Sequence, residues 1–167
     1  MSNIVYLISS LPSLTFGESP PISLDSFYND AKEQLSSRDF HKLHELDLQN
    51  INESDHSNLK NFVNQIESFK EDLLEIRNAK INDRNPLIST IPKTILDQNP
   101  LEREKSIMKW QWEQLTDIDA MGMFTITELF VYKLKLQILH RLHSFNETKG
   151  FELLESVVNP PKKMEES

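Results

Sequence analysis

The sequence contains no cysteine and only 3 glycines among its 167 residues. Without cysteine, the chain can form neither a disulfide framework nor a thiolate zinc site, and it has no cysteine nucleophile. The three glycines are also too few and too far apart to build the glycine-rich loops that hold the phosphates of a nucleotide. These absences argue against the enzyme classes that depend on such groups.

Positive charge and long hydrophobic runs are scarce as well. The 18 Lys and Arg residues are outnumbered by 26 Asp and Glu residues, and the resulting net charge of −8 argues against nucleic acid as a partner. The most apolar region, residues 124–142, is interrupted by charged and histidine side chains, unlike a membrane-spanning helix. The apolar run at residues 4–8 is too short for a signal peptide. We therefore expect a cytoplasmic protein without direct membrane insertion.

The apolar residues that are present recur mostly at helical spacing. This spacing predicts a mainly α-helical fold, a bundle of about five to six helices. Residues 4–14 are rich in β-branched and aromatic side chains and reach Pro12, which favours a short extended N-terminal segment over a helix without deciding between them. The predicted helices cover residues 23–35, 37–46, 57–80, 99–117, 125–144 and 151–158.

The whole chain, residues 1–167, is expected to form one helical domain. Within it, we expect N-terminal helices over residues 1–81, C-terminal helices over 99–158 and a charged tail over 159–167. Residues 82–98 contain prolines and asparagines but also several leucines and isoleucines, which predicts a packed connection and not a flexible linker.

Four polar positions carry helix start signals. Ser23 and Ser37 can each cap a helix, and Asn99 is followed by Pro100 in the first helical position. Thr125 and Glu128 have the spacing of a capping box. Breaks between helices are expected around Gly122 and Gly150.

Two helices have more apolar surface than one neighbour could cover. In the helix at residues 126–142, apolar side chains point nearly all round the axis, which is typical of a buried helix. In the preceding helix, Trp110 and Trp112 diverge onto two apolar stripes. Both helices would be buried in the middle of the bundle, or part of their surface would dock onto another subunit or a second copy of the chain.

The basic and histidine side chains near residues 126–143 have two interpretations. Lys133, Lys135 and Arg141 could simply solubilise the helix, with their aliphatic stems covering apolar surface, or they could contact an acidic partner. His140 and His143, like His41 and His44, are spaced so that both rings could face one metal ion, but no third ligand accompanies either pair. We expect neither a metal site nor a cofactor.

The acidic residues show no catalytic pattern. Glu71, Asp72 and Glu75 lie close together on one predicted helix, and Asp117 and Asp119 on another, but such groups are usually a solvated helix face. No serine lies in the sequence context of a known nucleophile. We expect a protein that is not an enzyme.

Several segments together resemble a known family. They are Tyr6-Leu7-Ile8-Ser9-Ser10-Leu11-Pro12-Ser13-Leu14, then Pro20-Pro21-Ile22-Ser23, Arg103-Glu104-Lys105 with Trp110-Gln111-Trp112, and Phe124 followed by Tyr132-Lys133-Leu134-Lys135-Leu136-Gln137-Ile138-Leu139-His140-Arg141. The pattern resembles bacterial proteins encoded with V-type ATPase genes. These proteins are similar to the C subunit of that rotary enzyme, whose eukaryotic counterpart is the d subunit.

This resemblance implies an all-helical, non-catalytic accessory or C-subunit-like component of a V-type ATPase. Such a component would act through contacts with the central stalk or the membrane ring, or would assist assembly. The chain is shorter than the C subunit, so a complete stalk socket is not expected. Partner contacts are predicted at Trp110, Trp112, Tyr132, Lys135 and Arg141. The alternative is a helical adaptor or regulatory protein unrelated to ATPases.

Overall fold

The computed structural model describes residues 3–49, 51, 59–119 and 124–158, without the side chains of residues 119 and 147–158. In these residues the chain is mainly helical and contains no strand. The helices are α1 (Ile4–Ser10), α2 (Leu24–Gln34), α3 (Ser37–Glu45), α4 (Lys60–Ile81), the 3-10 helix η2 (Lys93–Asp97), α5 (Pro100–Asp119) and α6 (Ile126–Val158). The predicted break at Gly122 and the predicted tail at 159–167 lie outside the described residues.

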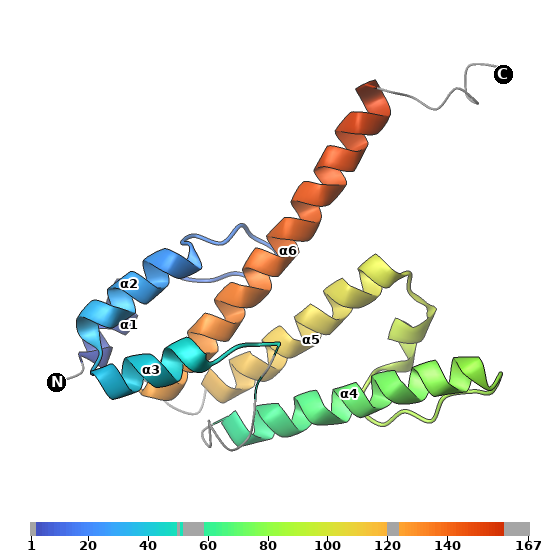
Figure 1. The fold of residues 1–167 in the computed structure, drawn as a ribbon, viewed down its shortest axis with the longest axis horizontal. Helices are drawn as coiled ribbons and strands as arrows, with labels where there is room; N and C mark the ends of the chain where they lie inside the picture. Colours follow the sequence, from blue (N-terminus) through green and yellow to red (C-terminus); the bar gives the residue numbers. More distant parts are fainter. Residues whose placement is uncertain (1–2, 50, 52–58, 120–123, 159–167) are drawn as a thin grey trace.

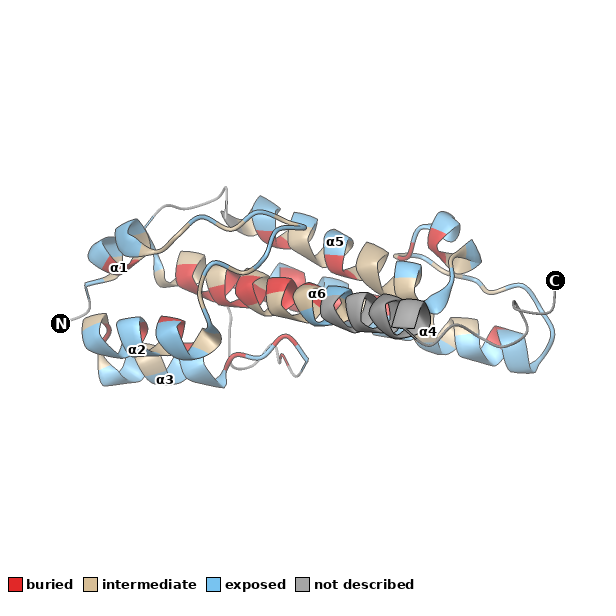
Figure 2. Cartoon of the chain, turned by 90° about the horizontal axis from the view of Figure 1, so that it is seen from above, coloured by how far each residue is buried: buried red, intermediate tan, exposed pale blue. Residues whose placement is uncertain are grey.

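The long helix α6 is the axis of the fold. Figure 1 shows the small helices α1, α2 and α3 gathered at the N-terminal half of α6, with α5 along another side of it. Helix α4 packs against α5, and η2 lies on the path from α4 to α5. Figure 2 shows that the buried residues concentrate in the first half of α6, whereas α4 is largely exposed toward its far end. None of the described helices is both long and apolar enough to cross a membrane.

The N-terminal segment differs from the extended segment that we predicted. Residues 4–10 form α1, which begins where the side chain of Asn3 accepts a hydrogen bond from the Tyr6 N–H at 3.3 Å. Leu7 is completely buried against the other helices, and this packing outweighs the weak helix propensity of the β-branched residues around it. The helix ends at Leu11, whose backbone is extended, as expected for a residue before proline.

Of the four predicted helix starts, two are confirmed, one is shifted by one residue, and the predicted capping box of α6 differs. The hydroxyl of Ser23 accepts from the Ser26 N–H at 3.1 Å, and the Asn99 side chain accepts from the Glu102 N–H at 2.9 Å, so both predicted caps are confirmed. The cap of α3 is Ser36 and not Ser37, because it is the Ser36 hydroxyl that accepts from the first turn of the helix.

At the start of α6, Glu128 reaches back to the N–H of Phe124, not to that of Thr125 as a regular capping box would require. Phe124 has a φ of 59° and therefore lies in the left-handed region. The helix then runs without a break to Val158, so the prediction of two helices separated at Gly150 was wrong. A single glycine inside a helix costs only about 1 kcal/mol relative to alanine and does not have to end it.

The core has a large part and a small part. The large part joins α1, α2, α3, α5, α6 and the first half of α4. The small part lies under residues 82–98, where Ile91 and Ile95 pack against Phe69 of α4 and Trp110 of α5. Within the same connection, however, Leu87 is 83% exposed.

One buried carboxylate fastens the connection to α4. Asp72 is only 4% exposed, and its oxygens accept hydrogen bonds from the backbone N–H groups of Ser89, Thr90 and Ile91 at 2.6 to 3.2 Å. Burial raises the pKa of this carboxyl, but the three backbone donors outweigh burial and hold the pKa below its ordinary value. The expectation that Asp72 lies on a solvated face was therefore wrong.

We predict that Asp72→Asn lowers the free energy of unfolding by about 2–3 kcal/mol at pH 7, because an amide cannot accept from all three N–H groups. Urea denaturation would measure this effect, with Glu71→Gln as the control at an exposed neighbouring position. Since the folded state has the lower pKa, the difference from wild type should persist down to about pH 4 and shrink as the pH falls through the lowered pKa. A difference that stays constant down to about pH 2 would contradict the assignment.

Candidate functional site

One of the segments that carry the resemblance, residues 132–141, lies in the first half of α6. Its apolar side chains are covered by the chain itself, because α1, α2, α3 and α5 pack around this half of the helix. The most deeply buried apolar side chains in this half of α6 are Leu129, Val131, Leu134, Leu136, Ile138 and Leu139, each no more than 1% exposed. The interpretation of α6 as the central helix of the bundle therefore accounts for its all-round apolar pattern.

Lys133 is the most unusual side chain on this helix. It is 1% exposed, and its ammonium donates hydrogen bonds to the backbone carbonyls of Leu43 at 2.8 Å and His44 at 3.0 Å, and to that of Leu46. These carbonyls lie at the C-terminal end of α3, where the last groups of a helix lack partners inside the helix. The cation thus completes the end of α3 and fastens it to α6. The expectation that Lys133 only solubilises the helix was wrong.

Burial and the neighbouring groups have opposite effects on the pKa of the Lys133 ammonium. Burial lowers its pKa to about 8, while the nearby carboxylate of Asp47 raises it. The ammonium also lies 5.0 Å from the centre of the Tyr28 ring, an arrangement that favours the charged form through a cation–π interaction. The Tyr28 ring, the carbonyls at the end of α3 and the Asp47 carboxylate all favour the charged form of Lys133, whereas burial favours the neutral form.

Three further polar side chains of α6 bind backbone groups of distant segments. The Tyr132 hydroxyl donates to the Pro12 carbonyl at 2.7 Å, and the Gln137 side-chain oxygen accepts from the Leu48 N–H at 3.1 Å. Nε2 of His140 lies 3.0 Å from the Ile22 carbonyl oxygen. We call Tyr132, Lys133, Gln137 and His140 the α6 clamp residues, because each fixes a segment from the first third of the chain.

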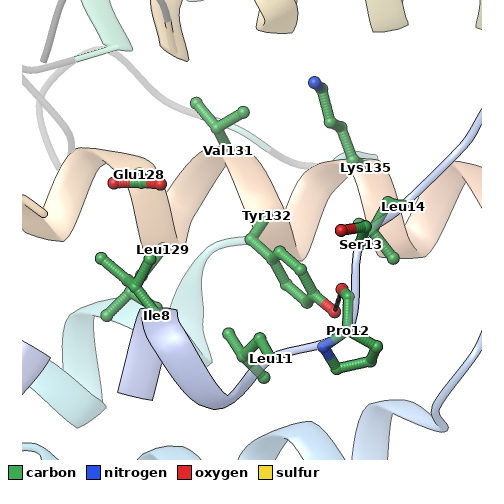
Figure 3. Close-up of a pocket in the computed structure, with 10 residues that line it drawn as sticks. All are labelled: Ile8, Leu11, Pro12, Ser13, Leu14, Glu128, Leu129, Val131, Tyr132 and Lys135. Atoms are coloured by element: carbon green, nitrogen blue, oxygen red, sulfur yellow. Dashed lines mark hydrogen bonds between the residues drawn. The ribbon is translucent and has the colours of Figure 1, made fainter. Parts of the chain in front are cut away.

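A cavity of about 260 Å³ lies where the chain around Pro12 crosses α6. Figure 3 shows the Tyr132 ring reaching toward Pro12, with Lys135 leaving the helix in a different direction. The hydroxyl of Tyr132 is taken by the Pro12 carbonyl, and the carboxylate of Glu128 by the Phe124 N–H. Two of the polar groups of this cavity, those of Tyr132 and Glu128, therefore bind backbone groups of the chain itself.

The five residues predicted to contact a partner all make contacts within the chain. Trp110 stacks on Phe69 at a centroid distance of 5.1 Å, and Trp112 meets Phe16 edge to face at 5.5 Å. The ammonium of Lys135 lies 4.9 Å from the Trp112 ring.

Arg141 pairs with Glu104 of α5 at 3.2 Å, and both side chains of this ion pair are more than a third exposed. Tyr132 is held by Pro12 as described above. All five residues are partly buried and none is fully enclosed, so their role toward a partner stays a prediction.

His41 and His44, which are spaced so that both could face one metal ion, make contacts with different residues. His41 pairs with Glu45 at the surface at 3.1 Å, while the His44 ring lies 5.0 Å from that of Tyr28. In the part of the chain that the structure describes, no three His, Asp or Glu side chains come close enough to hold a metal ion.

Two of the residues that organise the molecule were not assigned that role from the sequence. The available signal for Lys133 was its place in a helix that is otherwise apolar all round, where a charge needs partners from another element. For Asp72 the sequence holds no comparable signal, because Asp72 is one of several carboxylates on α4 and nothing in the sequence separates it from the others. Those others are exposed or paired at the surface. Its three donors come from residues 17 to 19 positions further along the chain.

A family model described as "Protein of unknown function (DUF2764)" matches residues 74–165. The chain belongs to this family. The matched region contains about the last third of α4, all of α5 and α6, and therefore all four α6 clamp residues. No curated protein and no solved structure matches the chain.

We predict that Lys133→Met destabilises the fold by about 2 kcal/mol at pH 8, because the carbonyls at the end of α3 lose their donor. Lys42→Met, at an exposed position of α3, is the control.

The effect of Lys133→Met should also depend on pH. The folded pKa of about 8 lies below the ordinary value of 10.5, so the unfolded chain binds more protons in this interval. Lys133 should therefore make the wild type gain stability relative to Lys133→Met as the pH rises from about 8 to 9.5. Parallel denaturation profiles of the two proteins in this interval would show that Lys133 has no lowered pKa.

We predict that Tyr132→Phe costs about 1 kcal/mol, since it removes the hydrogen bond to Pro12 without changing the packed ring. Tyr6→Phe is the matched control, because Tyr6 is 58% exposed. Hydrogen exchange should become faster in residues 4–11 of Tyr132→Phe alone. Equal exchange in both variants would mean that the hydroxyl does not hold this segment.

Proposed function

We propose that the chain is a non-catalytic accessory or C-subunit-like component of a V-type ATPase. It would act through protein–protein contacts with the central stalk or the membrane ring, or during assembly of the complex, and would lie at the membrane only through that complex. The proposal rests on the hydrogen bonds that polar side chains make in residues 132–141, one of the segments that resemble the V-type ATPase family. In residues 132–140, the clamp residues bind backbone of their own chain and not one another around a cleft.

A protein that transmits force between other subunits needs elements that do not slide past one another. Packing between apolar helix faces resists separation but is not directional, whereas hydrogen bonds from a side chain to a distant backbone fix position along the helix. Tyr132, Lys133, Gln137 and His140 make such bonds to distant backbone along about two turns of α6. This arrangement supports a mechanical role and gives no support to a reaction centre.

The partly exposed ion pair between Arg141 and Glu104 is the part of the predicted contact set that can be altered with least damage to the fold. An exposed pair of this kind contributes about 0.2–1 kcal/mol, so removing it should leave the chain folded. The guanidinium can hold a carboxylate through two parallel hydrogen bonds, which makes it a suitable contact for another subunit.

The test uses the purified full chain with purified central-stalk and membrane-ring subunits of a V-type ATPase from the same organism. We expect a stable complex with one of them in size-exclusion chromatography, and about tenfold weaker binding for Arg141→Ala than for wild type. Lys109→Ala, on the exposed side of α5, is the control. Failure of the wild type to bind any of these subunits would overturn the proposal. Unchanged binding by Arg141→Ala would remove this residue from the contact.

A further inference from the structure

The outer half of α4 carries an exposed stripe that the fold does not use. Lys70, Leu74, Arg77 and Ile81 follow one another at intervals of four, three and four residues, which places them on one side of the helix. Leu74 is 57% exposed and Ile81 is 79% exposed, and both basic residues are exposed as well. We call these four residues the α4 stripe. Figure 1 shows this half of α4 extending away from α6.

The α4 stripe is not the face by which α4 packs in the protein. The buried residues of the outer half, Phe69, Asp72 and Ala79, point to other sides of the helix. Among the described residues, no hydrogen bond or ion pair holds Lys70 or Arg77, whereas Arg84 just beyond the helix is paired with Glu75. Two large aliphatic side chains and two cations are therefore presented to solvent in alternation.

A groove between α4 and α5 opens beside the α4 stripe. It has a volume of about 160 Å³, and Lys70 belongs both to its edge and to the stripe. Phe69 and Leu73 of α4 and Ile107 of α5 form its apolar lining. Arg141 of α6 and Glu104 of α5 also line it and are paired with each other, so the cations left for a partner are those of the stripe. The groove could accept apolar side chains of a partner whose main contact is the stripe, in the way that pockets in other interfaces accept anchor residues.

We propose that the α4 stripe and this groove bind an amphipathic helix of another protein that carries carboxylates beside its apolar residues. The charge balance identifies the partner: the chain as a whole carries a net charge of −8, but the stripe contains two unpaired cations and no carboxylate. A helix with leucines at matching spacing would cover Leu74 and Ile81, and its carboxylates would meet Lys70 and Arg77. The stripe is about 16 Å long, which corresponds to about three turns of the partner helix.

An anionic membrane would be a different partner for a basic and apolar helix face. Glu67 and Glu71 lie on α4 next to the stripe and are exposed, so a lipid surface that contacted Lys70 and Leu74 would also approach these carboxylates. A partner helix can place its carboxylates at Lys70 and Arg77 alone, because its charges are discrete, whereas a lipid surface is anionic throughout. The charges on α4 therefore favour a protein helix over lipid headgroups.

The four residues of the α4 stripe are distinct from those of the predicted V-type ATPase contact, and the two surfaces share only Arg141, at the edge of the groove. Binding to the stripe requires only the stated chemistry of the partner. The probe is a synthetic amphipathic peptide of about 18 residues with leucines at the spacing of the stripe and glutamates beside them. A second peptide has glutamine in place of each glutamate. Binding of each peptide to the full-length chain is measured by fluorescence anisotropy at low and at high salt.

We expect the glutamate peptide to bind at least about tenfold more tightly than the glutamine peptide, with an affinity that falls as salt rises. Lys70→Glu combined with Arg77→Glu should weaken binding of the glutamate peptide by at least about tenfold, and Leu74→Ser should weaken binding of both peptides. Lys42→Glu combined with Lys109→Glu makes the same charge change at exposed positions elsewhere and should bind like wild type. Circular dichroism and thermal melting show that each variant is folded.

Three results would overturn the proposal. The first is equal binding of the glutamate peptide by wild type and by Lys70→Glu/Arg77→Glu, or no binding by wild type. The second is binding of wild type to phosphatidylserine vesicles that the same double variant abolishes, which would assign the stripe to a membrane. The third is a dimer of the chain alone, seen by light scattering and lost in the double variant, which would assign the stripe to a second copy.

Discussion

The fold depends on a buried positive charge at the place where α3 ends against α6. The ammonium of Lys133 donates to three carbonyls around the end of α3, within a site that is almost closed to solvent. A helix end that is buried without partners is unfavourable, and a buried cation without partners is more so. Each of these two groups reduces the cost of the other without removing it, since the pKa of Lys133 is still lowered to about 8, and their contact fixes the end of α3 against α6.

The opposite end of the molecule uses the same principle with reversed charge. Asp72 collects three backbone N–H groups from the connection after α4, just as Lys133 collects carbonyls from the end of α3. Around Asp72 the hydrophobic cluster is small, so the connection depends strongly on this carboxylate to stay in place. The molecule is thus organised by two ionised side chains that bind backbone, one in each half of the chain.

The sequence allowed the helical class, the caps Ser23 and Asn99, and the central position of α6 to be predicted, because each depends on local spacing or on one polar atom. The prediction failed where packing between segments that are distant in sequence determines the local structure. Residues 4–10 form a helix because Leu7 is buried by other elements, and the helix α6 passes Gly150 although glycine disfavours this conformation.

The candidate site was predictable as a segment but not in its contacts. The resemblance pointed to residues 132–141, and their periodicity indicated a buried helix. The partners of Tyr132, Lys133 and His140, however, lie about 90 to 120 residues away in sequence, in turns and helix ends with no pattern that would mark them as acceptors. Asp72 illustrates the same limit, since its binding role arises from the path of the connection and not from its neighbours on α4.

The uninterrupted length of α6 has a consequence for how motion would pass through the molecule. The helix has 33 residues and is therefore about 50 Å long, and among those of its residues whose side chains are described, the bonds to the N-terminal segments come from residues 132–140. A tilt of α6 would therefore be passed directly to the chain around Pro12, Ile22 and the end of α3, because these segments are bound to it. The helix and the segments bound to it would turn as one body.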